Sequence, residues 1–167
     1  MTTEIRAWRI DDAHALAENL NNKKIHDNLR DGLPYPYTEK DAEEYISAML
    51  SADKNKSFAF AIICDGNVAG SVGVFRRDNI HRKTGELGYY LGENYWNKGV
   101  TTEAVKAICK LVFENSDIIR IFAEPFARNA PSCRVLEKAG FVCEGVLKCD
   151  AVKNGVVEDV KMYALLK

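Results

Sequence analysis

The stretch Thr84–Glu114, TGELGYYLGENYWNKGVTTEAVKAICKLVFE, indicates the unit on which the fold is built. Its first part, Gly85–Leu91, is rich in residues that favour β-strands, and Gly92 ends it. Its last part predicts a helix from Val100, because apolar side chains recur at helical spacing on one face and charged side chains on the other. A short polar loop around Gly99 joins the two parts.

The loop around Gly99 has the form of a phosphate site. The first backbone N–H groups of a helix have no partner within it and carry partial positive charge, so a strand, a glycine loop and a helix together suit an anion. The other interpretation is a crossover in which Gly99 only eases a turn. A P-loop is not formed, because Asn97 replaces its second glycine and Gly99 replaces its hydroxyl residue. No Gly-x-Gly-x-x-Gly run supports a Rossmann dinucleotide site.

Size and charge restrict the class of protein. With 167 residues, 47% of them apolar and 28% charged, the chain is expected to form one domain over residues 1–167. The net charge of −1 does not indicate a nucleic-acid partner, and no apolar run approaches the length of a membrane span. Five cysteines without C-x-x-C spacing and three scattered histidines predict a reduced, cytoplasmic protein without a metal site.

The remaining segments predict further strands and helices around this unit. Strands are expected at Glu4–Ile10, Ser57–Cys64, Val68–Phe75, Ile118–Ala123, Phe141–Cys149 and Val156–Leu166. Helices are expected from Asp11 or Asp12 to Leu20, and over Asn22–Leu29, Thr38–Ser51 and Ala130–Lys138. Because a helix joins Gly85–Leu91 to Ile118–Ala123, these two strands are expected to be parallel. The prediction is a mixed α/β (α+β) fold with about seven strands and about four helices.

Several motifs, in a fixed order, carry a resemblance to a known family. They are Gly32–Thr38, Gly85–Leu91, Tyr95–Ala104, Asn129 with Ser132, and Glu137–Phe141. Together they resemble the GNAT superfamily of acyl-CoA N-acyltransferases, in its RimJ/RimL-type branch, over nearly the whole chain. The resemblance implies a GNAT fold with two splayed parallel strands in the middle of the sheet. It also implies an enzyme that transfers an acetyl group from acetyl-CoA directly to a primary amine, and a protein or peptide N-terminus is the first expectation.

For the cosubstrate, the resemblance implies a site made mainly of backbone groups. The pyrophosphate of coenzyme A is expected on the amides of Asn97–Thr102, and the pantetheine arm between the strands that end at Leu91 and Ala123. A backbone N–H near Leu91 is the expected donor to the thioester carbonyl. The residues implied to contact acetyl-CoA are Tyr90, Leu91, Asn97, Lys98, Gly99, Val100, Thr101, Thr102, Asn129 and Ser132. Asn129 has a second interpretation as the cap of the following helix.

For the chemistry, the resemblance implies roles for Glu86 and Ser132. An amine needs a base, and Glu86 lies at about the position of the catalytic glutamate of the histone-acetylating GNAT enzymes. Its other interpretation is a surface carboxylate. Ser132 matches the serine proposed as the acid in the RimL type, or is only a first-turn helix residue. The RimL-type base position holds Ala151, and the usual tyrosine position holds Leu136.

The acceptor site is expected between the Leu33–Tyr37 loop and the final hairpin. Tyr35 and Tyr37 are the candidate substrate-binding residues, or they pack the loop onto the core. Three hypotheses stay open: acetylation of a peptide N-terminus, acetylation of a small amine such as an amino acid or antibiotic, and a non-catalytic acyl-CoA sensor. No metal, nucleic acid or membrane is expected, and the exposed strands of the final hairpin are compatible with a homodimer.

Overall fold

The computed structural model describes residues 1–167 and contains one sheet of seven strands, in the order β1-β2-β3-β4-β5-β7-β6, and five α-helices. The strands are β1 (Thr3–Ala7), β2 (Ser57–Cys64), β3 (Asn67–Arg76), β4 (Thr84–Leu91), β5 (Arg120–Ala123), β6 (Val142–Lys153) and β7 (Val156–Leu166). The α-helices are α1 (Ala13–Leu20), α2 (Lys23–His26), α3 (Glu39–Ser51), α4 (Val100–Asn115) and α5 (Ala130–Lys138). The expected mixed sheet is confirmed, with five helices where about four were expected.

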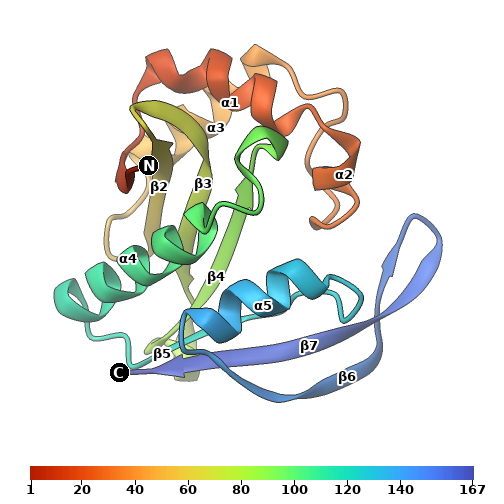
Figure 1. Ribbon diagram of the computed structural model, residues 1–167. Coiled ribbons are helices and arrows are strands. Elements are labelled where there is room, and N and C mark those ends of the chain that lie inside the picture. The colour runs from red at the N-terminus through yellow and green to blue at the C-terminus, as the bar shows by residue number, and fades with distance from the viewer.

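Helices cover both faces of the sheet, and a hydrophobic core lies on each side. Buried side chains of α4 and α5 meet Leu87 and Leu91 of β4 on one face. Buried side chains of α1 and α3 meet Ala61 and Ile63 of β2 on the other face. Figure 1 shows α4 and α5 in front of the sheet and α1 and α3 at its upper end. Side chains at alternate positions of a strand therefore pack against helices on opposite faces of the sheet.

The parallel pair at the centre of the sheet is short, and its strands then splay apart. β4 and β5 pair only over Thr84–Glu86 and Arg120–Phe122. Beyond these residues β4 continues, and Figure 1 shows it rising away from the β6–β7 hairpin. Gly88 in the middle of β4 is exposed, and a Cβ placed on it would meet no atom within 4 Å. Beyond Glu86, β4 therefore has no hydrogen-bonded neighbour on the side of β5, although it lies inside the sheet.

One helix cap and one helix boundary differ from expectation for local reasons. Asp12 is the N-cap of α1, and the helix ends at Leu20 as expected, but the Asp12 carboxylate accepts hydrogen bonds from the Arg6 guanidinium at 2.7 and 2.8 Å and from the Arg9 N–H at 2.8 Å. No side-chain cap is left for α1. The helix expected over 22–29 ends at His26, so α2 has a single turn. α3 begins with a capping box, in which the side chains of Thr38 and Asp41 each accept from the backbone N–H of the other residue.

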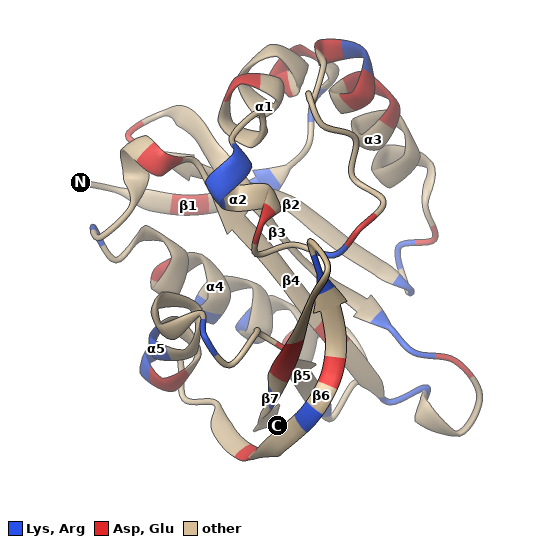
Figure 2. Cartoon of the chain, turned by 90° about the vertical axis from the view of Figure 1, so that its right-hand side faces the viewer, with Lys and Arg blue, Asp and Glu red and all other residues tan.

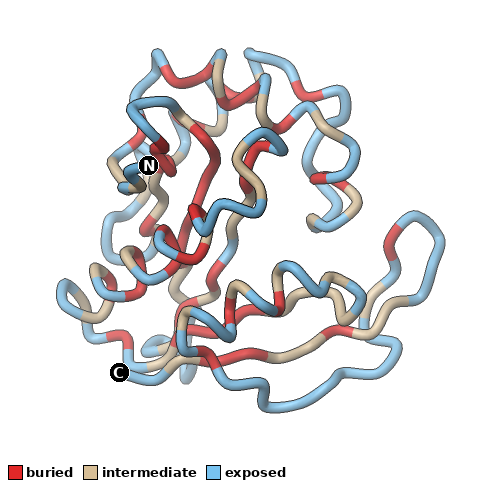
Figure 3. The backbone as a smooth tube through the Cα atoms, viewed as in Figure 1, coloured by how far each residue is buried: buried red, intermediate tan, exposed pale blue.

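The terminal hairpin carries β6 as a free edge of the sheet. Nearly all of β6 is exposed and is pale blue in Figure 3. Its register with β7 shifts between Leu147 and Ala151, where Cys149 has a φ of 53°, so the strand bulges. The strand expected to end at Cys149 therefore continues to Lys153, because pairing resumes beyond the bulge. None of the helices combines the length and the apolar character needed to cross a membrane.

Candidate functional site

The splay of β4 leaves backbone groups directed away from β3. Gly92 N donates to Ala69 O, and Arg77 N donates to Thr84 O, at the two ends of an unbroken antiparallel register. In such a ladder, hydrogen-bonded positions alternate. The even-numbered residues of β4 therefore bond to β3, and the N–H of Leu91 faces the splay. This is the group expected to donate to a thioester carbonyl.

The loop before α4 presents a run of unpartnered backbone donors. The N–H groups of Asn97–Thr102 donate to no protein acceptor, and the first helical bond runs from Glu103 N to Gly99 O. Gly99 is the N-cap with a φ of 80°, it offers no side-chain cap, and a Cβ there would meet no atom within 4 Å. Asn97 also has a positive φ, of 60°. Consecutive free N–H groups at the start of a sixteen-residue helix suit an anion such as a pyrophosphate.

Side chains hold this loop in place. Trp96 Nε1 donates to Leu91 O at 2.7 Å, which ties the loop to the end of β4. Lys98 Nζ donates to Asn94 O at 2.8 Å, so the positive charge of Lys98 is held close to the backbone of the same loop. The Glu93 carboxylate accepts from Asn22 Nδ2 at 2.7 Å, at the cap of α2. These side-chain hydrogen bonds therefore restrain the loop that carries the free N–H groups.

Glu86 lies at the point where β4 and β5 separate. Its side chain is 22% exposed and pairs with the guanidinium of Arg30, which follows α2. The same guanidinium lies 3.7 Å from Glu124, directly after β5. Residues far apart in the sequence thus meet at the splay, and a cation lies between two carboxylates. Figure 2 shows acidic and basic residues interspersed on this side of the molecule.

Asn129 and Ser132 meet at the start of α5. Asn129 Oδ1 accepts from Ser132 N at 3.3 Å, so the capping interpretation of Asn129 is confirmed. Its amide nitrogen donates to no protein group, which leaves that donor free. The Ser132 hydroxyl lies 2.7 Å from the hydroxyl of Tyr89 on β4. Ser132 is therefore more than a first-turn helix residue, because it links α5 to the strand beside the splay.

The tyrosines expected at the site lie in different surroundings. Tyr37 is only 4% exposed and belongs to the core under α1 and α3, and burial raises its pKa to about 12. Tyr35 is exposed and its ring lies 4.9 Å from that of His26. The backbone of Tyr90 pairs with Ser71, and its buried hydroxyl has no hydrogen-bond partner. Tyr37 and Tyr90 thus pack in the core, and Tyr35 alone remains at the surface.

The bulge in β6 bears on the position that holds the base in the RimL type. Ala151 occupies that position, and Asp150 beside it is exposed and forms no hydrogen bond or ion pair. Leu136, at the usual tyrosine position, is fully buried in the core. Neither position supplies a proton-transfer group held at the splay.

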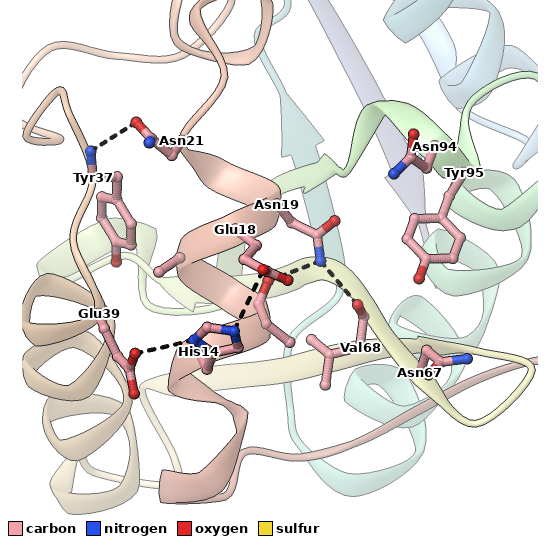
Figure 4. Close-up of a pocket in the computed structure, with 12 residues that line it drawn as sticks. His14, Glu18, Asn19, Asn21, Tyr37, Glu39, Asn67, Val68, Asn94 and Tyr95 are labelled. Carbon is pink, nitrogen blue, oxygen red and sulfur yellow. Dashed lines mark hydrogen bonds and ion pairs between the residues drawn. The ribbon is translucent and has the colours of Figure 1, made fainter.

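A separate hollow of about 810 Å³ lies between α1 and the β2–β3 turn (Figure 4). His14 bridges Glu18 and Glu39 on its wall, and the hydrogen bond that its ring donates to Glu39, together with the charge of Glu18, raises the pKa of His14. Asn94 and Tyr95 form its other wall. Of the expected site residues only Tyr37 lines it, so this hollow and the splay are distinct.

Sequence reasoning missed two residues at the splay, Arg30 and Tyr89. Nothing local to Arg30 indicates its partners, because Glu86 and Glu124 are distant in the sequence and the contact follows from tertiary packing. Tyr89 carried a usable signal: alternation along β4 places it on the same face as Leu87 and Leu91, toward α5.

Comparisons with known proteins agree with this geometry. Residues 3–142 match the family model described as an acetyltransferase (GNAT) domain. The chain is 35% identical over 117 residues to the probable N-acetyltransferase YjcK of Bacillus subtilis, a match that covers 70% of this chain and 65% of that relative. It is 25% identical to the ribosomal-protein-serine acetyltransferase of Escherichia coli over 98% of this chain and 97% of the relative.

A solved structure extends the likeness over the whole fold. It is that of RimL, a ribosomal L7/L12 alpha-N-protein acetyltransferase in complex with coenzyme A, and it superposes with a TM-score of 0.87 at 24% identity. The alignment covers 99% of this chain and 94% of the other. At this identity the likeness establishes the fold, and the expected splayed GNAT architecture is confirmed.

Proposed function

Since the chain belongs to the GNAT acetyltransferase family, we propose that it transfers an acetyl group from acetyl-CoA to a primary amine, and that the amine is a protein or peptide N-terminus. The observation that carries the proposal is the run of free N–H groups at Asn97–Thr102 beside the splay of β4 and β5. A loop of free N–H groups lies next to the strand that opens at the splay, and Glu86 supplies a carboxylate where that opening begins.

Acetyl-CoA binding in this proposal relies on the backbone. The N–H groups of Asn97–Thr102 hold the pyrophosphate, and the braced loop lowers the entropy lost on binding. The free amide nitrogen of Asn129 donates to the pantetheine arm, which lies in the splay. Thr101 stands where the family pattern has a smaller residue, but its backbone donates, so the side chain does not decide affinity.

The chemistry in this proposal divides among three groups. The Glu86 carboxylate takes the proton of the acceptor ammonium, directly or through one water molecule, after Arg30 moves aside. The Leu91 N–H donates to the carbonyl oxygen on which negative charge builds up. The Ser132 hydroxyl donates to the sulfur as the carbon–sulfur bond breaks. The thioester is already reactive, so orientation of the amine supplies much of the remaining acceleration.

The choice of acceptor rests on the relatives and on charge. Two of the relatives that match nearly the full chain are named for acetylation of ribosomal proteins, one of them at an alpha-amine. Glu86 and Glu124 flank one cation in the structure, which suits an acceptor that arrives as an ammonium. A small amine carries the same charge and is the competing acceptor.

Two measurements test the proposal. Thermal denaturation with acetyl-CoA, with coenzyme A and with ATP is expected to show stabilisation by the first two only. Thiol release is then followed with a panel of N-terminal peptides, Nα-acetylated versions of them and free amino acids. We expect release with the unblocked peptides alone. If acetyl-CoA did not stabilise the protein, both the enzyme hypothesis and the acyl-CoA sensor hypothesis would be overturned. If acetyl-CoA stabilised the protein but no substrate gave thiol release, the enzyme hypothesis would be overturned in favour of the sensor.

Assembly and location complete the proposal. β6 is an edge strand, paired with β7 on one side only, and carries exposed apolar side chains such as Val142, Val146 and Val152; such an edge supports pairing with a second copy. We place the protein in the cytoplasm, where its five free cysteines stay reduced. Light scattering during size-exclusion chromatography tests the homodimer: a mass near 18.7 kDa at micromolar concentration would contradict it.

A further inference from the structure

Tyr89 and Ser132 form a hydrogen-bonded pair across the splay. Tyr89 lies on the face of β4 that meets α4 and α5, and its hydroxyl is 2.7 Å from Ser132 Oγ and donates to Ser132 O at 3.3 Å. Asn129 Oδ1 accepts from the Ser132 N–H, so the serine is held from its backbone as well. The hydroxyl of Ser132 therefore has one protein partner, and that partner is Tyr89.

Either hydroxyl of this pair can donate, since the two oxygens lie 2.7 Å apart. Burial raises the pKa of Tyr89 to about 12, so the phenol keeps its proton near neutral pH, and as the more acidic of the two hydroxyls it is the better donor. Its single proton can be shared between Ser132 Oγ at 2.7 Å and the Ser132 carbonyl at 3.3 Å. When the phenol donates to Ser132 Oγ, the proton on Ser132 is left free to point elsewhere.

We propose that Tyr89 is a positioning residue that orients the Ser132 hydroxyl, so that Ser132 donates a hydrogen bond to the thiolate leaving from acetyl-CoA. The inference rests on the proposed function and deepens it. The acceptor ammonium first loses one proton through Glu86 to solvent. The nitrogen–carbon bond then forms from the lone pair of the neutral amine, the carbon–sulfur bond breaks with its electron pair going to sulfur, and Glu86 takes the second proton, which the nitrogen gives up as the amide forms.

Acidity distinguishes hydrogen bonding from full proton transfer at this pair. A thiol has a pKa of about 8.5, more than three units below the value of about 12 for Tyr89. A thiolate therefore does not remove the proton of the pair. The pair stabilises the sulfur through a charge-assisted hydrogen bond, and the thiolate takes its proton from solvent after it leaves.

A double-mutant cycle tests the proposal on the intact chain. We expect Ser132→Ala to lower kcat at least tenfold and Tyr89→Phe to lower it about fivefold, with the Kd for acetyl-CoA and the KM for the amine changed by less than about twofold. The double variant should be no slower than Ser132→Ala, because Tyr89 acts through Ser132. Multiplicative losses, or a kcat within twofold of wild type in Tyr89→Phe, would overturn the proposal.

A matched control separates positioning from stability. Tyr163 is also buried, and its hydroxyl donates to Glu137 of α5 at 3.0 Å and forms no hydrogen bond with Ser132. Tyr163→Phe should lower the melting temperature as Tyr89→Phe does and leave kcat unchanged. If Tyr89→Phe does not fold, Ser132→Ala decides, since an unchanged kcat there also overturns the proposal. Absence of thiol release by the wild type would instead overturn the proposed function.

Discussion

The Asn97–Thr102 loop lies beyond the end of β4, and Glu86 and Glu124 lie where β4 and β5 separate; the loop offers backbone groups, and the two carboxylates are side chains. The loop donors come from chain geometry: a left-handed Gly99 and the start of a long helix. The carboxylates Glu86 and Glu124 depend on what packs beside them, and here the exposed side chain of Arg30 lies between them. We call the Asn97–Thr102 loop the backbone half of the site and the two carboxylates its side-chain half. Binding by the backbone half should tolerate changes of side chain and be lost when the backbone dihedrals change. The function of the side-chain half should depend on the identity of the side chains.

The largest expected effect is on the backbone half. Gly99→Val puts a β-branched residue at a φ of 80°, which costs on the order of 1–3 kcal/mol or forces the loop to another conformation. Either way the N–H groups lose their common direction. We expect the Kd for acetyl-CoA, measured by calorimetry, to rise roughly 10- to 100-fold.

Gly155 provides the matched control for this substitution. It has a φ of 76°, and a Cβ there would also meet no atom within 4 Å, but it lies in the β6–β7 turn. Gly155→Val should cost similar stability and leave the Kd for acetyl-CoA unchanged. Equal losses of affinity in both variants would mean that Gly99 acts only through folding.

The next effect is on the side-chain half. Glu86→Gln keeps the shape of the side chain and removes the base, so we expect kcat to fall about 100-fold with the Kd for acetyl-CoA unchanged. Glu124→Gln is the control, because it removes the other carboxylate near Arg30 and should lower kcat by less than about fivefold. A kcat within twofold of wild type in Glu86→Gln would remove Glu86 from the mechanism.

A smaller effect is expected when the competing cation is removed. Arg30 is 72% exposed, and pairs of that kind contribute about 0.2–1 kcal/mol. Arg30→Ala should therefore raise kcat/KM for the amine by up to about fivefold, because the acceptor no longer displaces a guanidinium from Glu86. Steady-state kinetics at low amine concentration measures this. A fall in kcat/KM would mean that Arg30 binds the acceptor.

The smallest effect is expected at Thr101. Its side chain departs from the family pattern, but its contribution in the proposal is an N–H group that alanine retains. Thr101→Ala should change the Kd for acetyl-CoA by less than about twofold in the same calorimetric titration. A tenfold change in either direction would show that this half of the site also depends on side chains.

The same contrast explains how much the sequence could predict. Gly99, the strand before it and the amphipathic helix after it are local signals, so the loop, the parallel β4–β5 pair and most element positions were predicted correctly. The bulge near Cys149 depends on pairing with β7, and the predicted end of that strand was wrong. The bounds predicted for α1 were right, but the contact of Asp12 with Arg6, which leaves α1 without a side-chain cap, was not predicted.

Partnerships at the site follow the same division. The contact of Arg30 with Glu86 joins residues that are 56 positions apart, and that of Tyr89 with Ser132 joins residues 43 positions apart. No local pattern encodes such contacts. Tyr37 looked like a wall of the acceptor site because it follows two prolines, but its ring lies in the core.

In the proposed function, the backbone N–H groups of Asn97–Thr102 and of Leu91 donate hydrogen bonds to acetyl-CoA. A chain of 18.7 kDa suits two-dimensional ¹H–¹⁵N NMR, which observes each of these groups separately. On titration with acetyl-CoA, we predict that the largest amide shifts fall on Asn97–Thr102 and Leu91, while Asn19 and Asn67 in the separate hollow stay unchanged. Shifts confined to that hollow, with the loop amides unmoved, would contradict the account.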